Sequence, residues 1–227
     1  MLPVMTILQV KIFATFLGVG LAIVSLIGAY YWRIWKRQIK VWGDFAASRG
    51  WRFEFQPGFM NLIGTLRLDG EHAGRPFIVE TEHRGFGRYR HIVTIIRHDL
   101  GPRFPREVTI RPEKLAHKLG KLIGVRDEEI GDTQLDAALD LKNVTPQARD
   151  LLLGGRLHRP LLNLVRGFET FTIENGKLTA EVIDVPRTTI ALYTLLAPVR
   201  ELADAMPSSR DASHEHEGDA TPEAAGA

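Results

Sequence analysis

The sequence predicts an α+β protein: an N-terminal transmembrane helix, one globular domain with an antiparallel sheet and helices, and a disordered C-terminal tail. Three observations lead to this prediction. Residues 12–31 contain no charged side chain. Short segments rich in β-branched and aromatic residues follow, and turn residues join several of them. Helical patterns gather mostly after these segments, which favours hairpins over a doubly wound sheet.

The apolar run is long enough to cross a bilayer, because twenty residues at about 1.5 Å each give roughly 30 Å of helix. A cleaved signal peptide would carry its basic residues before the run and end in small residues, and a buried core helix is rarely so free of charge. We therefore predict a span over 12–32 that is integral to the lipid bilayer, after a short segment 1–11. Aromatic and basic side chains predict its interface, namely Trp32, Arg33, Trp35, Lys36, Arg37 and Lys40.

The charges that flank the span predict its orientation. Lys11 precedes it, whereas four Lys or Arg residues follow within nine positions, in a basic juxtamembrane linker at 33–41. Loops with excess Lys and Arg stay in the cytoplasm, so we expect the N-terminus outside and the C-terminal domain inside. The reverse topology, with the domain in the periplasm, is the alternative.

The globular domain is expected over 42–206. Residues 42–48 are helical and can continue the span, because no proline intervenes. Strands are expected at 51–55, 65–68, 77–81, 89–97 and 107–111. Asp69-Gly70 and Ala73-Gly74 both have turn chemistry.

The second half of the domain is expected to carry most of the helices. Pro112 suits the first turn of a helix that ends at residue 123, and Thr145-Pro146 opens another that ends before Gly154. A short helix at 160–167 precedes a hairpin, whose strands at 168–174 and 177–183 flank the Asn175-Gly176 turn. The last helix covers 188–206, and Pro198 should kink it or start a new segment. Residues 207–227 lack large apolar side chains and should be an acidic, disordered tail.

The composition excludes several kinds of chemistry. The chain has no Cys, which removes disulfides, thiolate metal sites and cysteine nucleophiles. Ser48 is the only Ser within 42–206 and lies in no nucleophile-elbow motif. Neither a P-loop nor a GxGxxG motif occurs. We name no catalytic residue and expect no cofactor.

Carboxylates form the first candidate site, at Asp132 and Asp136 with Asp140 beyond them. On a helix, carboxylates four residues apart share one face and can bind a divalent cation through oxygen. If the segment is a strand entered from a turn, the same side chains instead brace loops through backbone N–H groups. We favour bracing and leave the metal unknown. Histidines do not complete such a site, because His91 and His98 point to opposite faces of a strand.

A basic hairpin forms the second candidate site, with Phe86 at a glycine-flanked tip among Arg84, Arg88 and Arg90. Such a loop can bind an anionic membrane surface, with the aromatic ring inserted and the arginines on headgroups. A further basic face is expected at Lys114, Lys118 and Lys121. Nucleic acid would use the same residue types, but the nearby span favours lipid over nucleic acid. A solvated, arginine-rich surface without a ligand is the remaining interpretation.

Several motifs carry a resemblance to a known group of proteins. Trp42, Phe45, Ala46, Arg49, Gly50 and Trp51 form a WxxFAxxRGW pattern, and Ile130-Gly131-Asp132 leads to Asp136. With the single N-terminal span and a helix–hairpin–helix module at 145–206, the chain resembles uncharacterised bacterial single-pass membrane proteins that carry a domain of unknown function. Leu135 departs from the Phe common at that position. The resemblance implies a bacterial membrane-anchored domain and supplies no activity, cofactor or catalytic residue. We expect the protein in the bacterial cytoplasmic (inner) membrane.

The function we expect is a membrane-anchored, non-enzymatic binding module that meets the membrane surface or an unknown protein partner. The alternative is a hydrolase or other enzyme that uses Asp132 and Asp136 with a divalent metal. The net charge of +2 conceals an uneven distribution, since residues 1–40 carry +5 and residues 207–227 carry −4. The oligomeric state is not predicted.

Overall fold

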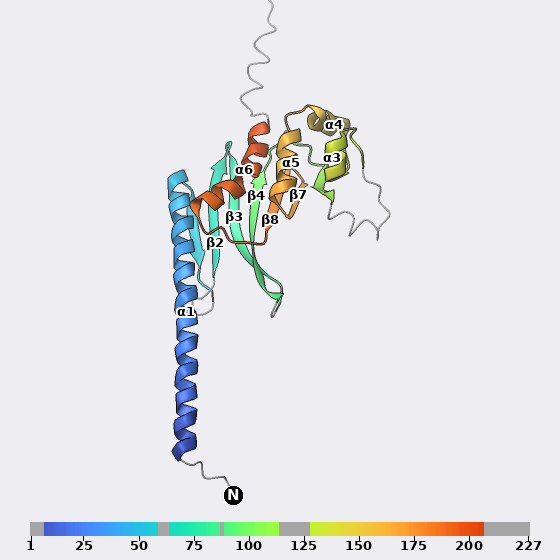
Figure 1. The fold of residues 1–227 in the computed structure, drawn as a ribbon. Coiled ribbons are helices and arrows are strands. Elements are labelled where there is room, and N and C mark those ends of the chain that lie inside the picture. The colour runs from blue at the N-terminus through green and yellow to red at the C-terminus, as the bar shows by residue number, and fades with distance from the viewer. Residues whose placement is uncertain (1–6, 59–63, 87–88, 114–127, 207–227) are drawn as a thin grey trace, which may run out of the picture.

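A computed structural model describes residues 7–58, 64–86, 89–113 and 128–206. Within these residues, a long N-terminal helix leads into an eight-stranded antiparallel sheet with further helices, which confirms the predicted fold class (Figure 1). Arg88, the lysine face at 114–121 and the tail at 207–227 lie outside the described residues. The division of the chain into domains stays a prediction.

The helix α1, Ile7–Arg49, is a single element of 43 residues and about 64 Å at 1.5 Å per residue. Its described side chains from 12 to 33 are exposed, apart from Gly28, whereas Trp35, Trp42 and Phe45 are buried in the domain core. The expected continuity into residues 42–48 is therefore confirmed. Residues 33–41, which we expected to be a linker, are part of the same helix.

The sheet has the strand order β1-β2-β3-β4-β8-β7-β5-β6, and every recorded pairing is antiparallel. The strands are β1 Arg52–Gln56, β2 Thr65–His72, β3 Arg75–Arg84, β4 His91–Asp99, β5 Thr109–Pro112, β6 Leu139–Lys142, β7 Thr170–Glu174 and β8 Lys177–Val182. Each expected strand is present with shifted ends. The β7–β8 hairpin turns at Asn175 and Gly176, whose φ angles of 53° and 71° fit the predicted type I′ turn.

The interpretation of Asp69-Gly70 as a turn was wrong, because β2 runs straight through both residues. A Cβ atom on Gly70 would lie 2.3 Å from the ring of Trp51. The glycine therefore leaves space for an indole that crosses the strand. The chain turns instead at Ala73 and Gly74, as also expected, with φ angles of 52° and 72°.

One face of the sheet forms the core. A row of paired residues crosses five strands in the order Leu68, Val79, Ile96, Ala180, Phe171, and each of these is buried. Burial of such apolar side chains is the largest favourable contribution to the free energy of folding. Helices α1, α5 and α6 cover this face through buried side chains that include Trp42, Phe45, Leu161, Leu164, Leu192, Leu196 and Val199.

Four further helices are described, namely α3 Thr133–Ala138, α4 Pro146–Leu153, α5 His158–Gly167 and α6 Thr189–Ala205. Of these, α4 and α6 begin where the sequence predicted. The expected helix at 160–167 begins earlier, at His158. Thr145 caps α4 through the N–H of Ala148, with Pro146 at the first helical position, as predicted. Pro112 ends β5 instead of standing in the first turn of a helix, which corrects that expectation. Pro198 starts no new segment, because α6 continues through it as one helix, and a kink at this residue stays a prediction.

Candidate functional site

The register of the strands places the basic hairpin at the sheet end nearest to the apolar half of α1. Trp35 packs against Phe55 with ring centroids 6.0 Å apart, and Phe45 packs against Trp51 at 5.9 Å, so β1 runs antiparallel to α1. Because β1 to β4 pair antiparallel in sequence, the pair formed by Arg84 and His91 lies at the same end of the sheet as Phe55. The β3–β4 hairpin therefore projects in the same direction as the N-terminal half of α1 (Figure 1).

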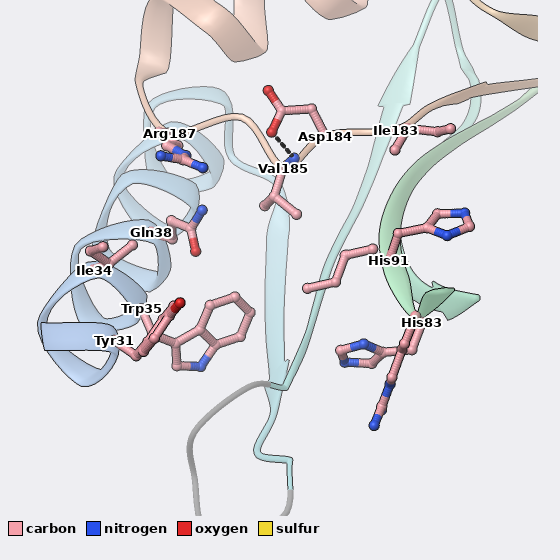
Figure 2. Close-up of a pocket in the computed structure, with 12 residues that line it drawn as sticks. Tyr31, Ile34, Trp35, Gln38, His83, His91, Ile183, Asp184, Val185 and Arg187 are labelled. Carbon is pink, nitrogen blue, oxygen red and sulfur yellow. Dashed lines mark hydrogen bonds between the residues drawn. The ribbon is translucent and has the colours of Figure 1, made fainter. Parts of the chain in front are cut away.

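A cavity of about 680 Å³ lies between α1, this hairpin and the loop that joins β8 to α6. It is lined by Tyr31, Ile34, Trp35, Gln38, His83, Arg90, His91, Ile92, Ile183, Asp184, Val185 and Arg187. Figure 2 shows the Trp35 ring and the Val185 side chain pointing into this space, with His83 on the opposite side. We call it the helix-base cavity.

The loop wall of the helix-base cavity is fixed to both neighbouring elements. The hydroxyl of Thr94 donates to the carbonyl of Asp184 at 2.5 Å, and the indole Nε1 of Trp42 donates to the carbonyl of Pro186 at 3.0 Å. Asp184 also accepts the backbone N–H of Val185 through Oδ1 at 2.7 Å. These contacts hold the loop in place between β4 and α1, so this side of the cavity has a fixed shape.

Histidine protonation in the cavity is set by its surroundings. Burial lowers the pKa of His83, and the nearby positive charge of Arg90 lowers it further, while a backbone hydrogen bond at Gly64 partly opposes both effects. The lowered pKa favours the neutral imidazole of His83. The indole Nε1 of Trp35 is buried without a hydrogen-bond partner among the described residues.

The arginines of the predicted hairpin site differ in their partners. Arg84 is bound to the carboxylate of Glu181 through two hydrogen bonds of 2.6 and 2.9 Å. Arg90 makes no ion pair with a carboxylate in the described part of the chain, and it lines the helix-base cavity. Phe86 is 93% exposed at the tip. Among the described residues of the hairpin, Arg90 therefore carries a positive charge that no carboxylate neutralises.

The residues predicted at the membrane interface are also placed in two groups. Trp32 is 37% exposed, and the ammonium of Lys36 lies 4.9 Å from the centre of its ring. Arg33, Arg37 and Lys40 are exposed on the same helix. Trp35 is only 4% exposed and belongs to the domain core, so its ring has almost no surface for lipid.

The carboxylates of the first candidate site accept backbone hydrogen bonds. Asp132 caps α3 by accepting from the N–H groups of Gln134 and Leu135 at 2.9 and 3.0 Å. The Leu135 bond is the main cause of the lowered pKa of Asp132. Asp136 turns back and accepts from Ile130 and Gly131 at 2.9 and 3.0 Å. The segment is the helix α3 and not the strand that we linked to bracing, but the backbone contacts are those of the bracing hypothesis.

The structure brings no metal-binding set together in the residues it describes, where no group of three or more His, Asp or Glu side chains could hold an ion. Asp140 is buried on β6, with Lys142 Nζ 3.9 Å from its Oδ2. His98 is buried on β4 and hydrogen-bonds to the carbonyl of Pro76, whereas His83 and His91 are among the residues that line the helix-base cavity.

Most of the helix-base cavity could not be predicted from the sequence. Gln38, Asp184, Val185 and Arg187 were not named, because nothing in their local patterns marks them. They meet only because β8 returns beside β4 and the following loop lies against α1. A single sequence holds no local signal for such a contact.

No protein-family model matches the chain, and no curated protein matches its sequence. Among solved structures, its fold is distantly similar to the mycobacterial trehalose monomycolate transport factor A, TtfA, with a TM-score of 0.42 and 12% identity. The likeness covers 75% of this chain and 97% of the other. No conclusion about function follows from a likeness this distant. Within the described residues, one helix, Ile12–Arg49, is long and apolar enough to cross a membrane.

Proposed function

We propose that this protein is a membrane-anchored, non-enzymatic binding module that works at the cytoplasmic face of a bacterial inner membrane. The observation that supports it best is the continuity of α1. One unbroken helix joins an exposed apolar half to a buried half that carries Trp35, Trp42 and Phe45. An exposed apolar helix of this length is stable in lipid, and in water its surface would favour association.

The proposed placement holds the domain against the bilayer. If residues 12–32 span the membrane, the first core residue of α1, Trp35, follows three positions later, at about 4.5 Å along the helix. A helix without a flexible linker keeps the sheet at a fixed height and angle. The end of the sheet with Arg90 and Phe86 then faces the headgroups, where a basic residue contributes about 1 kcal/mol on an anionic surface.

The bound partner in this proposal is the membrane surface together with a protein that remains to be identified. Binding is favoured over catalysis because the carboxylates with the best candidate spacing, Asp132 and Asp136, already accept two backbone hydrogen bonds each. The enzyme alternative uses these two side chains with a divalent metal. Replacing both by Asn separates the two hypotheses. A chain of unchanged stability that had lost a metal-dependent activity would support the enzyme, and a chain of lowered melting temperature without such a loss would support bracing.

Two measurements on the full chain test the anchor and its orientation. The protein should remain in the membrane pellet after an alkaline carbonate wash, which strips peripheral proteins. Alkaline phosphatase fused after residue 227 should be inactive, since that enzyme folds only outside the cytoplasm. Release by carbonate would overturn the anchor, and an active fusion would overturn the orientation.

A further inference from the structure

The helix-base cavity begins where the proposed span ends. Tyr31, the last residue of the charge-free run, lines one end of it, and Gln38 lines it seven residues later, about 10 Å further along α1. The inference below rests on the membrane anchoring proposed above. With α1 in the bilayer, the cavity stands beside the headgroups of the adjoining leaflet, and a lipid can enter it without crossing water.

The cavity is amphipathic along its length. Figure 2 shows Gln38 and Arg187 toward one end and Tyr31 toward the other. The lining also includes five apolar residues, Ile34, Trp35, Ile92, Ile183 and Val185. A ligand that fits has a polar group at the end away from the membrane and an apolar chain that leads back to the bilayer. That is the shape of a membrane lipid partly lifted from its leaflet.

The charges of the lining select the kind of lipid. Arg90 and Arg187 carry two positive charges, and neither makes an ion pair with a carboxylate among the residues that the structure describes. Asp184 carries the one acidic side chain named in the lining, and one of its oxygens is occupied by Val185 N–H. The lowered pKa of His83 favours its neutral form, so the guanidinium groups leave an excess of positive charge. Arg90 lies at the hairpin end, toward the headgroups, and Arg187 lies at the other end, where a phosphodiester with a single negative charge complements it.

We propose that the helix-base cavity binds one molecule of an anionic phospholipid, such as phosphatidylglycerol, from the leaflet that adjoins the domain. Arg187 holds the phosphate, the carboxylate of Asp184 accepts a hydroxyl of the glycerol headgroup, and the first part of an acyl chain lies on Ile34 and Ile92. The volume of about 680 Å³ lies within the range of ligand pockets and accommodates a headgroup with the start of its chains. The protein thereby recognises an individual lipid as well as a charged surface.

Native mass spectrometry of the full-length protein in non-ionic detergent tests this site. Phosphatidylglycerol and phosphatidylcholine with the same acyl chains are added in turn, and the fraction with one bound lipid is measured. We expect tighter binding of phosphatidylglycerol. Loss of a hydrogen bond to a charged group weakens binding roughly tenfold or more, so Arg187→Gln should lower the phosphatidylglycerol affinity by about that factor.

Two control variants and one competition experiment test whether the lipid binds at the helix-base cavity. Arg106→Gln removes the same charge from a second cavity at the opposite end of the sheet and should leave lipid binding unchanged. Ile183→Trp fills the exposed lip of the helix-base cavity and should weaken both lipids. Excess glycerol 3-phosphate should fail to displace the lipid, because it lacks the acyl chain. Displacement would instead assign the site to a soluble phosphate compound and overturn the proposal.

The proposal is also overturned if both lipids bind equally, or if Arg187→Gln and Arg106→Gln have the same effect. These outcomes are separate from failure of the proposed function, because binding in detergent does not depend on how α1 lies in a membrane. If the protein stays in the membrane after the carbonate wash but prefers neither lipid, the anchor is supported and the lipid site is refuted. If carbonate releases the protein, the anchor itself is refuted.

Discussion

His98 is a buried imidazole whose protonation opposes folding. It is 2% exposed, and its Nδ1 donates to the carbonyl of Pro76 at 3.0 Å. Burial is the main cause that lowers the pKa of His98 to about 4, and the hydrogen bond to Pro76 partly offsets it. The unfolded chain has an ordinary histidine pKa near 6.5, so between about pH 6.5 and 4 the unfolded state binds more protons. Stability should therefore fall as the pH falls through this window.

The pH dependence gives the first prediction. Lowering the pH from 7 to 5 should cost the wild-type domain roughly 2 kcal/mol through His98 alone. His98→Asn keeps a donor for Pro76 and lacks a titrating ring. Its loss of unfolding free energy between pH 7 and 5 should therefore be smaller than that of the wild type by about 2 kcal/mol. Urea unfolding of the full chain in non-ionic micelles measures both. Identical pH profiles for the two proteins would refute the assignment.

Asp136 braces the turn that leads into α3. It accepts from the backbone N–H groups of Ile130 and Gly131, and Ile130 is 2% exposed. Asp136→Ala would leave a buried donor without a partner, which costs roughly 1–3 kcal/mol of unfolding free energy. Asp136→Asn retains one acceptor oxygen and should lose less. Asp150→Ala, at an exposed site on α4, is the matched control and should stay within about 0.5 kcal/mol of wild type.

At the scale of elements, Trp42 joins α1 to the rest of the domain. Its side chain has no exposed surface, and its Nε1 donates to Pro186 in the loop after β8. Trp42→Ala should destabilise the domain by roughly 3–5 kcal/mol, as large core truncations do. Trp32→Ala removes the same group from a position on α1 that is 37% exposed, and we expect little change. Equal losses in thermal unfolding would show that α1 does not pack as described.

The β3–β4 hairpin should be protected by an anionic bilayer. Trypsin cuts after Arg90 at this end of the sheet and after Arg103, which lies in the loop beyond β4 at the other end. Phosphatidylglycerol in proteoliposomes should slow the cut at Arg90 by roughly fivefold, because a near-surface charge contributes about 1 kcal/mol. The cut at Arg103 is the internal control. High salt should remove the protection, since screening shortens the reach of these charges to about 3 Å at 1 M.

The elements that the sequence predicted well depend on local chemistry. The charge-free run, the Thr145-Pro146 helix start and the Asn175-Gly176 turn each need only neighbouring residues. The errors arose where a distant partner decides. Gly70 looked like a turn because nothing nearby shows that Trp51 lies across it.

The residues of the candidate sites also divide into those that a local pattern in the sequence marks and those that only a distant contact brings together. Asp132, Asp136, Phe86 and Arg90 were found from spacing and charge within short segments. Arg187 was missed because its neighbours in the helix-base cavity lie about 100 and 150 residues earlier in the chain. The partner of Arg84, Glu181, is equally remote, so its charge looked free in the sequence.

At the scale of the whole molecule, one rigid helix fixes the height and direction of the domain. The apolar half of α1 and the basic hairpin lie at the same end of the sheet, and the β2–β3 turn lies at the other (Figure 1). Because the chain has no Cys, a single introduced Cys can carry a fluorescent label at a chosen position. Phe86→Cys places it at the hairpin, and Glu71→Cys places it at the far end.

The central claim is that α1 holds the domain with its hairpin on the membrane surface, and the most direct test is the depth of these two labels in anionic proteoliposomes. We expect the label at residue 86 to shift to shorter emission wavelength and to be quenched by brominated lipids, with the label at residue 71 unaffected. Equal quenching at the two positions, or none at residue 86, would contradict the account.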